Sequence, residues 1–387
     1  MRYKNVNLMS RTQKTDGTSR CLAQMENIKR QSLSNQMSER ITSLRWLCIV
    51  LVLMQHAVQW PYFQASLADF CFEPAFGWVY MIVVYGLGIG IVPVFFIISG
   101  YLQFAKPRNY KDTILKKLEG LMLPMLIWTA VACLEYLALK KWTGRILKFA
   151  FLESSNPLDW LKGIFGDYSG MLSGSIGVPL LYQFWFIRDL FILSILSPLI
   201  SWLLHKIPCI YMTLCLLALV FVISPLTAPH ALFFYSLGGL CAIRNWDFFS
   251  LADKWIPWPL VIAGCIAAVF YVHSEGLYCS ITTHFSAHLP TFFLLLKLSG
   301  ILISHRKADA FVRIMAPHSM FLYCSHGYMI IYVIGLLLIR FIDVTGTLGM
   351  IFFVLALFVA DLLICTLAGV LLRRYLPKTF SVLCGGR

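Results

Sequence analysis

The stretch ERITSLRWLCIVLVLMQHAVQW, residues 39–60, decides the fold class, because it is an apolar helix candidate that carries two ionisable side chains, Arg45 and His56. The two residues are eleven positions apart. At about 100° per residue this spacing returns to nearly the same helix face after three turns, and at about 1.5 Å per residue it spans roughly 16 Å. If the helix starts in the cytoplasm, the guanidinium lies at the inner membrane surface and the imidazole lies inside the bilayer. An ionisable side chain at that depth is costly and indicates a functional site.

The rest of the chain has the composition of a membrane protein. It has 387 residues, of which 59% are hydrophobic and 13% are charged. Repeated long apolar runs predict an all-α fold, a polytopic membrane helical bundle with about ten transmembrane helices. The expected spans are 41–60, 78–104, 119–139, 181–204, 208–224, 231–243, 256–273, 285–303, 317–339 and 347–372.

The distribution of Lys and Arg sets the expected orientation. The segment before the first span and alternate connections such as 105–118 are basic, whereas the connections at 61–77 and 274–284 contain no Lys or Arg. The positive-inside rule then places both termini in the cytoplasm. The basic connection 140–180 is expected outside all the same, because long external segments obey the rule weakly. We therefore interpret the net charge of +14 as a topology signal and expect no nucleic-acid partner.

Three segments are predicted along the chain. Residues 1–38 are polar, basic and rich in Ser, Gln and Asn, which is typical of a disordered tail, here on the cytoplasmic side. Residues 39–378 form the membrane domain, and residues 379–387 form a short C-terminal tail. Met37 is an alternative start to Met1, and the sequence leaves this choice open.

The cysteine pattern does not indicate a metal site. The twelve cysteines show no CxxC pair and no Cys/His ligand spacing, and most fall within expected spans. A cysteine there behaves as a small apolar residue. We therefore expect no bound metal.

Six segments give the chain a family resemblance. ERITSLRWLCIVLVLMQH resembles the first span of the acyltransferase 3 family of integral-membrane acyltransferases, whose signature there is Arg, ten residues, His. Later segments resemble the family in order: VPVFFIISGYL (92–102), KKLEGLMLP (116–124), YQFWFIRDLFILSILSPL (182–198), FYSLGGLCA (234–242) and MFLYCSHGYMI (320–330). The resemblance covers about residues 39 to 375. One departure is that Lys116 and Lys117 stand near the place where the family often has Arg-x-x-Arg.

The resemblance implies that 39–378 is a membrane acyltransferase domain. Such an enzyme moves an acyl group, commonly acetyl, from cytoplasmic acyl-CoA to a hydroxyl of an extracytoplasmic or lipid-linked glycan. Acyl-CoA is then a donor substrate, no cofactor is bound permanently, and the partners are the donor, a glycan or lipid-linked saccharide acceptor and membrane lipids. A multi-pass protein of a bacterial inner membrane is the expected setting.

Candidate roles follow for the residues on the first span and the basic loop. Arg45 could hold a phosphate of the donor, and Lys116 and Lys117 are further donor-binding candidates. His56 could take the acceptor's proton as a general base, or carry the acyl group itself. The alternatives are structural: His56 could bond a neighbouring helix, and Arg45 could be an ordinary snorkelling residue.

Four further residues are candidates for the site, each with a structural alternative. Ser99 and Tyr101 lie near the end of the second span, where Ser99-Gly100 could instead mark close helix packing. His326 is a second imidazole at membrane depth and could simply bond another helix. Trp185 could stack on a sugar ring or belong to an interfacial aromatic belt.

Four intramembrane or near-membrane charges also need partners. Lys297 and Asp361 are expected to pair with each other or to line the donor's path. Arg188 and Asp189 are adjacent, so on a helix they are not expected to face each other.

A second function remains open from sequence. Many spans with intramembrane charges also describe transporters, so a polysaccharide or lipid-linked glycan transporter or export component is the alternative. A transporter should show inverted-repeat symmetry, and the sequence shows none by eye. A third class, a non-enzymatic assembly protein, has no need of His56.

Overall fold

The computed structural model describes residues 6–106, 109–143, 154–166, 179–221, 228–275 and 281–386. Every regular element in these ranges is a helix, and no strand occurs among them. The all-α fold class is therefore confirmed. Four helices are long and apolar enough to cross a membrane, and the number rises to seven if each bent helix pair is one span. The expected count of ten spans and the cytoplasmic placement of the termini stay predictions.

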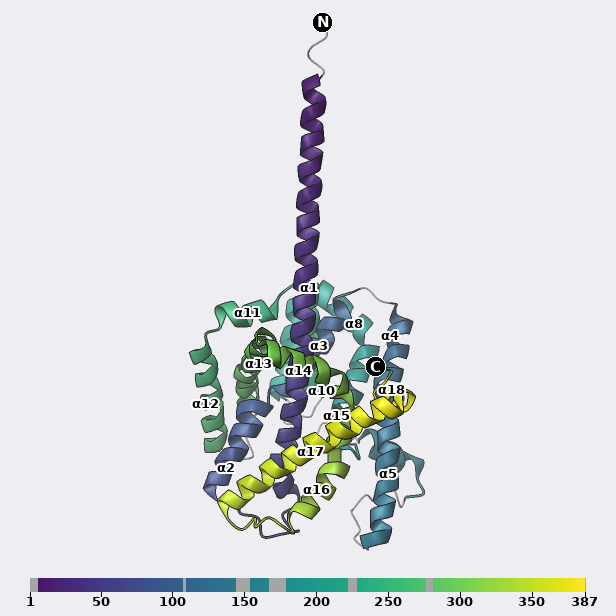
Figure 1. Cartoon of the computed structure of the whole chain (residues 1–387), viewed down its shortest axis with the longest axis vertical. Coiled ribbons are helices and arrows are strands. Elements are labelled where there is room, and N and C mark those ends of the chain that lie inside the picture. Colours follow the sequence, from purple (N-terminus) through teal and green to yellow (C-terminus); the bar gives the residue numbers. More distant parts are fainter. Residues whose placement is uncertain are drawn as a thin grey trace.

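The long helix α1 (Val6–Phe63) is the axis of the bundle. Its N-terminal part projects away from the other helices, and its apolar part, Asn35–Phe63, runs through them (Figure 1). Arg45 and His56 therefore lie on one continuous helix, as the spacing predicted. The division of the chain into 1–38, 39–378 and 379–387 stays a prediction.

The other three unbroken spans match expected ones. They are Pro74–Phe104, Tyr110–Glu135 and Thr347–Tyr375. The helices of these spans are α2 (Pro74–Met81), the π-helical η1 (Ile82–Gly88), α3 (Ile91–Phe104), α4 (Tyr110–Lys117), the π-helical η2 (Leu118–Met122), α5 (Leu123–Thr143) and α17 (Thr347–Tyr375). Figure 1 shows α17 crossing the bundle obliquely on its way to the C-terminal helix α18 (Pro377–Leu383).

Of the other expected spans, 181–204 is bent in the structure and 208–224 and 231–243 are short, whereas the bends beside 256–273 and 285–303 fall outside these expected spans. The bent pairs are α7 (Trp185–Ile195) with α8 (Ser197–Lys206) at 63°, α11 (Phe248–Trp255) with α12 (Trp258–Glu275) at 100°, and α13 (Ile281–Ser304) with α14 (Arg306–Met315) and the helices after it at 106°. Prolines explain two of these bends, because Pro198 and Pro257 exclude an uninterrupted helix. The shorter apolar helices are α9 (Pro208–Phe221) and α10 (Ala228–Ile243).

The chain after α14 is divided into short helices where one span, 317–339, was expected. These are η5 (Ala316–His318), α15 (Ser319–Ser325), the π-helical η6 (His326–Ile330) and α16 (Ile331–Leu338). The backbone leaves the helical region at Gly327, with φ −55° and ψ −168°. The kink thus falls immediately after His326.

Glycines hold α3 directly against α10. A β-carbon added at Gly100 would lie 1.9 Å from the carbonyl oxygen of Tyr235, and one added at Gly238 would lie 2.0 Å from the carbonyl oxygen of Ile97. The two backbones therefore approach as closely as glycine allows, which is the small-residue packing common between membrane helices. Gly100 of the Ser-Gly-Tyr motif consequently has a packing role.

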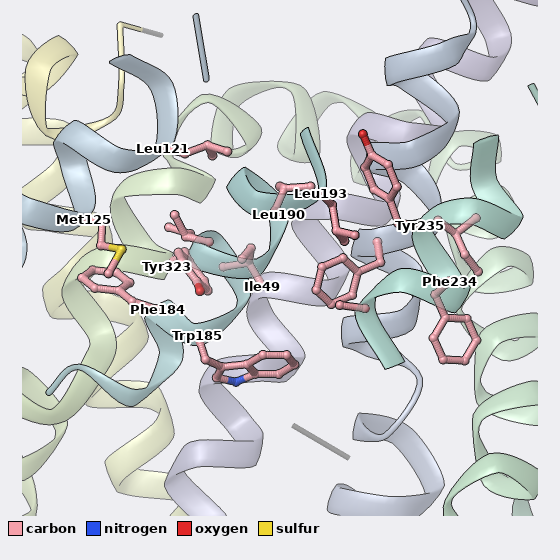
Figure 2. Packing of buried hydrophobic residues seen from close by; sticks show 14 of the residues in the cluster. Ile49, Leu121, Met125, Phe184, Trp185, Leu190, Leu193, Phe234, Tyr235 and Tyr323 are labelled. Carbon is pink, nitrogen blue, oxygen red and sulfur yellow. The ribbon is translucent and has the colours of Figure 1, made fainter. Parts of the chain in front are cut away.

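The largest apolar core joins α1, α3, α7, α10 and α15. Figure 2 shows Ile49 of α1 near Phe184, which immediately precedes α7, and near Trp185 and Leu190 of α7, with Phe234 and Tyr235 of α10 in the same core. Two short helices, η4 (Tyr182–Phe184) and α15, end inside this core. The core therefore fixes the segments that carry Tyr182, Tyr323 and His326.

Candidate active site

The two intramembrane histidines meet in the bundle. The rings of His56 on α1 and His326 at the start of η6 stack with 5.2 Å between their centroids and 13° between their planes. His326 has no exposed surface, whereas His56 is half-buried. Segments from opposite ends of the sequence thus form one two-imidazole centre.

The hydrogen bond of His326 fixes which of its nitrogens carries the proton. Nδ1 lies 2.8 Å from the carbonyl oxygen of Leu322, one helical turn earlier. A carbonyl oxygen can only accept, so in the neutral ring Nδ1 donates and Nε2 carries the lone pair. Within the described part of the chain Nε2 is buried and has no hydrogen-bond partner. His326 therefore presents a fixed proton acceptor.

Two polar side chains hold His56, one from η4 and one from the next turn of α1. The Tyr182 hydroxyl, from η4, contacts Nδ1 of His56, and the two rings meet edge to face with 4.8 Å between centroids. Gln59, one turn further along α1, shares side-chain hydrogen bonds with His56 and with Tyr80. These partners orient the imidazole, as the groups around catalytic histidines do.

A small polar cluster lies beside the histidines on α15 and α17. Asp361 is fully buried, and the Cys365 thiol donates to its Oδ1 over 3.4 Å. Asp361 also interacts electrostatically with Tyr182. Ser325, which precedes His326, is buried and near Cys365. The centre therefore joins α1, η4, α15, η6 and α17.

Arg45 and the two lysines occupy different places. Arg45 is half-buried on α1, three turns before His56. Lys116 is exposed and Lys117 half-buried at the end of α4, which packs against η2 and α7. In Figure 1, α4, α8 and α11 lie toward the end of the bundle from which the N-terminal part of α1 projects. The donor-binding roles of these three residues stay predictions.

A hollow of about 820 Å³ lies at the same end of the bundle, beside α11. Arg40 and Tyr101 line it together with Asp247 and Lys254. The Arg40 guanidinium pairs with Asp253, donates to the carbonyl oxygen of Leu296 over 2.7 Å and lies 4.4 Å from the centre of the Phe249 ring. Tyr101 packs edge to face on Phe248 in this region. It therefore lies at the hollow and not with the histidines.

Ser99 and Trp185 are placed by helix packing. Ser99 is half-buried next to Gly100, where α3 meets α10. Trp185 is 7% exposed, and its ring centroid lies 6.2 Å from that of Phe96 in the core that Figure 2 shows. The burial of Trp185 is inconsistent with its structural alternative, a place in an interfacial aromatic belt. Site roles for Ser99, Tyr101 and Trp185 stay predictions.

One sequence interpretation of charged residues was wrong, and one alternative of a second is excluded. Nε of Arg188 donates to Oδ1 of its neighbour Asp189 over 2.9 Å, and the guanidinium also donates to the carbonyl oxygen of Phe165, at the end of α6 (Pro157–Phe165). The arginine side chain is long enough to fold back on its neighbour, which the rule for helix faces ignores. For Lys297 and Asp361 the structure decides one alternative: they do not pair, and Nζ of Lys297 lies 5.2 Å from the ring centre of Trp258. That they line the donor's path stays a prediction.

Sequence reasoning missed several members of the centre. Tyr182, Gln59 and Gln183 were not selected, although each is a polar residue within or beside an apolar run. At membrane depth a polar side chain needs a partner or a function. That signal was present, but it did not show which of the many polar residues would meet. Among the residues described, no cluster of three or more His, Cys, Asp or Glu side chains could hold a metal.

Comparison with known proteins identifies the class to which this bundle and centre belong. Residues 39–372 match the family model described as an acyltransferase domain, acyltransferase 3. The chain belongs to this family, as the motifs indicated, and is an integral-membrane O-acyltransferase. It is similar to the succinoglycan biosynthesis protein ExoH of Rhizobium meliloti (strain 1021), with 25% identity over 319 residues that cover 76% of this chain and 79% of that protein. No solved structure matches the chain.

Proposed function

We propose that this enzyme moves an acetyl group from cytoplasmic acyl-CoA to a hydroxyl of an extracytoplasmic or lipid-linked glycan. The family supports acyl transfer, and the relative's part in succinoglycan biosynthesis supports a polysaccharide acceptor. The proposed setting is a bacterial inner membrane, with ten spans, both termini in the cytoplasm and the acyl-CoA acting as a substrate that leaves after each turnover.

The observation that carries this proposal is the stacked pair of histidines. A buried imidazole with a fixed lone pair, beside a half-buried imidazole held by a tyrosine, is a proton-accepting centre inside an apolar bundle. A neutral hydroxyl becomes a good nucleophile when such a base takes its proton. The centre thus fits a reaction whose first need is to activate a hydroxyl.

The proposed step conserves atoms and charge. His56 takes the proton of the acceptor hydroxyl as its oxygen attacks the thioester carbon, and the oxygen–carbon bond forms. The carbon–sulfur bond then breaks, and the coenzyme A thiolate takes the proton back from His56. His326 lies against His56, and its fixed Nε2 lone pair stabilises His56 while that ring carries the proton. The products are the acyl ester and free coenzyme A.

The offset between Arg45 and His56 suits the shape of the donor. Coenzyme A carries phosphates at one end and the thioester at the end of a flexible arm. Arg45, roughly 16 Å from His56 along α1, would hold a phosphate while the arm extends toward the histidines. The basic helix α4 and the hollow beside Arg40 lie toward the same end of the bundle, where a polyanion would enter.

The test is transfer by the purified protein. We expect the protein, reconstituted in lipid with [14C]acetyl-CoA and cell-surface glycan, to form a base-labile ester on the glycan. The His56→Ala protein, correctly inserted, should not. A transporter would move unmodified glycan and form no ester, and an equal yield of ester from His56→Ala would contradict the role of this centre.

A further inference from the structure

The side-chain amide of Gln183 is an unexplained polar group in the middle of the core. Gln183 belongs to η4 and is 4% exposed. In the part of the chain that the structure describes, neither its Nε2 nor its Oε1 has a hydrogen-bond partner. Buried amides without partners are rare because burial removes their bonds to water. A buried amide without partners either only destabilises the fold or forms its hydrogen bonds with an atom of a bound ligand.

The backbone places this amide beside two segments of the centre, the residue that contacts His56 and the residue that follows His326. Tyr182, the residue before it, contacts His56, and the Gln183 carbonyl oxygen accepts a hydrogen bond from the Tyr323 hydroxyl. The amide packs on Gly327, the residue after His326: a β-carbon added there would lie 1.9 Å from Nε2. Fixed contacts on both sides therefore hold the donor group in place before any ligand arrives.

We propose that the Gln183 amide holds the carbonyl oxygen of the transferred acyl group and donates to it through Nε2. This inference rests on the proposed function. As the acceptor oxygen attacks, the carbonyl oxygen gains negative charge, and a fixed N–H donor in an apolar site stabilises that charge strongly. The amide neither gains nor loses a proton, so the balance of the transfer step is unchanged.

The burial of Gln183 favours the acyl group over the sugar as its ligand. A side chain with 4% of its surface exposed can be reached by a thin, flexible thioester arm, whereas a sugar ring would have to displace core side chains. The half-buried His56 is the part of the centre that an acceptor can approach. Donor and acceptor thus meet between an inner amide and an outer imidazole.

Two variants and a matched control test this inference. Gln183→Met keeps the length of the side chain but removes the donor, and Gly327→Ala leaves the amide intact but pushes it away. Gln103→Met makes the same chemical change in α3, where Gln103 is half-buried and bonds Ser197. We expect kcat to fall on the order of 100-fold or more in both test variants and by less than about threefold in the control. The KM for each substrate should change by less than about threefold.

A spectroscopic measurement on the unaltered protein does not depend on the folding of any variant. In the unaltered protein, the infrared carbonyl band of bound [1-13C]acetyl-CoA should lie below its position for the thioester in an apolar solvent. The shift should disappear in Gln183→Met. An unshifted band in a protein that still transfers acetyl groups, or a loss confined to the acceptor's KM, would overturn the inference and leave the proposed function standing. Absence of transfer in both the unaltered protein and Gln103→Met would instead overturn the proposed function, and this inference with it.

Discussion

His56 and His326 stack with 13° between their ring planes, and each has its own hydrogen-bond environment: Tyr182 contacts Nδ1 of the first, and the Leu322 carbonyl oxygen accepts from Nδ1 of the second. This arrangement predicts that the two rings act as a unit. We expect His56→Ala and His326→Ala each to lower kcat on the order of 100-fold or more, the usual scale for loss of a general base. The double variant should lose little beyond either single one, because groups that act together are not additive.

The control for this prediction is His205→Ala. His205 makes the same type of bond, from Nδ1 to the carbonyl oxygen of Ser201 one turn earlier, but it lies exposed at the end of α8. Its removal should leave kcat unchanged. Initial-rate kinetics of the four variants and the unaltered protein measure these losses, and strictly multiplicative losses for His56 and His326 would show that they act separately.

Tyr182 should act through His56 and not through the substrates. Tyr182→Phe removes the hydroxyl that contacts Nδ1 but keeps the ring, so we expect kcat to fall about tenfold, equivalent to about 1.4 kcal/mol, with acetyl-CoA affinity unchanged. Tyr110→Phe is the control, since its hydroxyl donates over 2.9 Å to the carbonyl oxygen of Ile195 on the exposed side of α4. A Tyr182→Phe enzyme that matches the Tyr110→Phe enzyme in kcat would remove Tyr182 from the centre.

Loss of Arg45 should weaken donor binding, whereas loss of His56 should lower turnover. Loss of a charge-assisted bond to phosphate predicts that Arg45→Ala weakens acetyl-CoA binding about tenfold or more, with the effect reduced at high salt. Arg313→Ala is the control, because Arg313 is exposed and occupied by ion pairs to Glu39 and Asp309. Calorimetric titration of each protein with acetyl-CoA measures the difference. If Arg45→Ala binds the donor as the unaltered protein does, Arg45 is only an interfacial residue.

The α3–α10 contact predicts a large loss of stability from a single methyl group. Gly100→Ala would place a β-carbon 1.9 Å from the carbonyl oxygen of Tyr235, a backbone atom that cannot move without separating the helices. We expect a loss of about 3 kcal/mol or more, at the upper end of the range for overpacked cores. Gly77→Ala is the control: nothing lies within 4 Å of its added β-carbon, so it should be neutral or slightly stabilising. Thermal unfolding in detergent compares the two, and equal melting temperatures would refute the packing argument.

Sequence predicted the parts of this account that are local. The Arg45–His56 spacing fixes their relation along α1, because a helix has a constant rise and turn per residue, and composition alone indicates a helical membrane bundle. The four unbroken spans follow from length and apolar content. The bend at Pro198 was also readable, since proline interrupts a helix, but the continuous apolar run 181–204 was given more weight. At Pro257 the expected span 256–273 already began beside the bend.

The centre itself depends on contacts that no local rule supplies. His326 and Tyr182 meet His56 because three distant segments pack into one core, and the sequence gives no distance between them. The kink at Gly327 likewise depends on a tertiary contact, since the Gln183 amide occupies the space that a side chain at residue 327 would need. For Arg188 and Asp189 the local rule itself was misleading. Adjacent residues point to different faces of a helix, but the arginine side chain is long enough to reach its neighbour's carboxylate.

The most direct test of the central claim is a sidedness experiment on sealed vesicles that contain the protein in one known orientation. [14C]Acetyl-CoA is supplied on the side of the N-terminus and glycan on the other side, and ester formation on the glycan is measured for the unaltered, His56→Ala and His205→Ala proteins. We predict ester formation across the membrane with the unaltered and His205→Ala proteins, and at least about a 100-fold lower rate with His56→Ala. Transfer that requires acetyl-CoA on the side of the glycan, or that proceeds equally well without His56, would contradict the account.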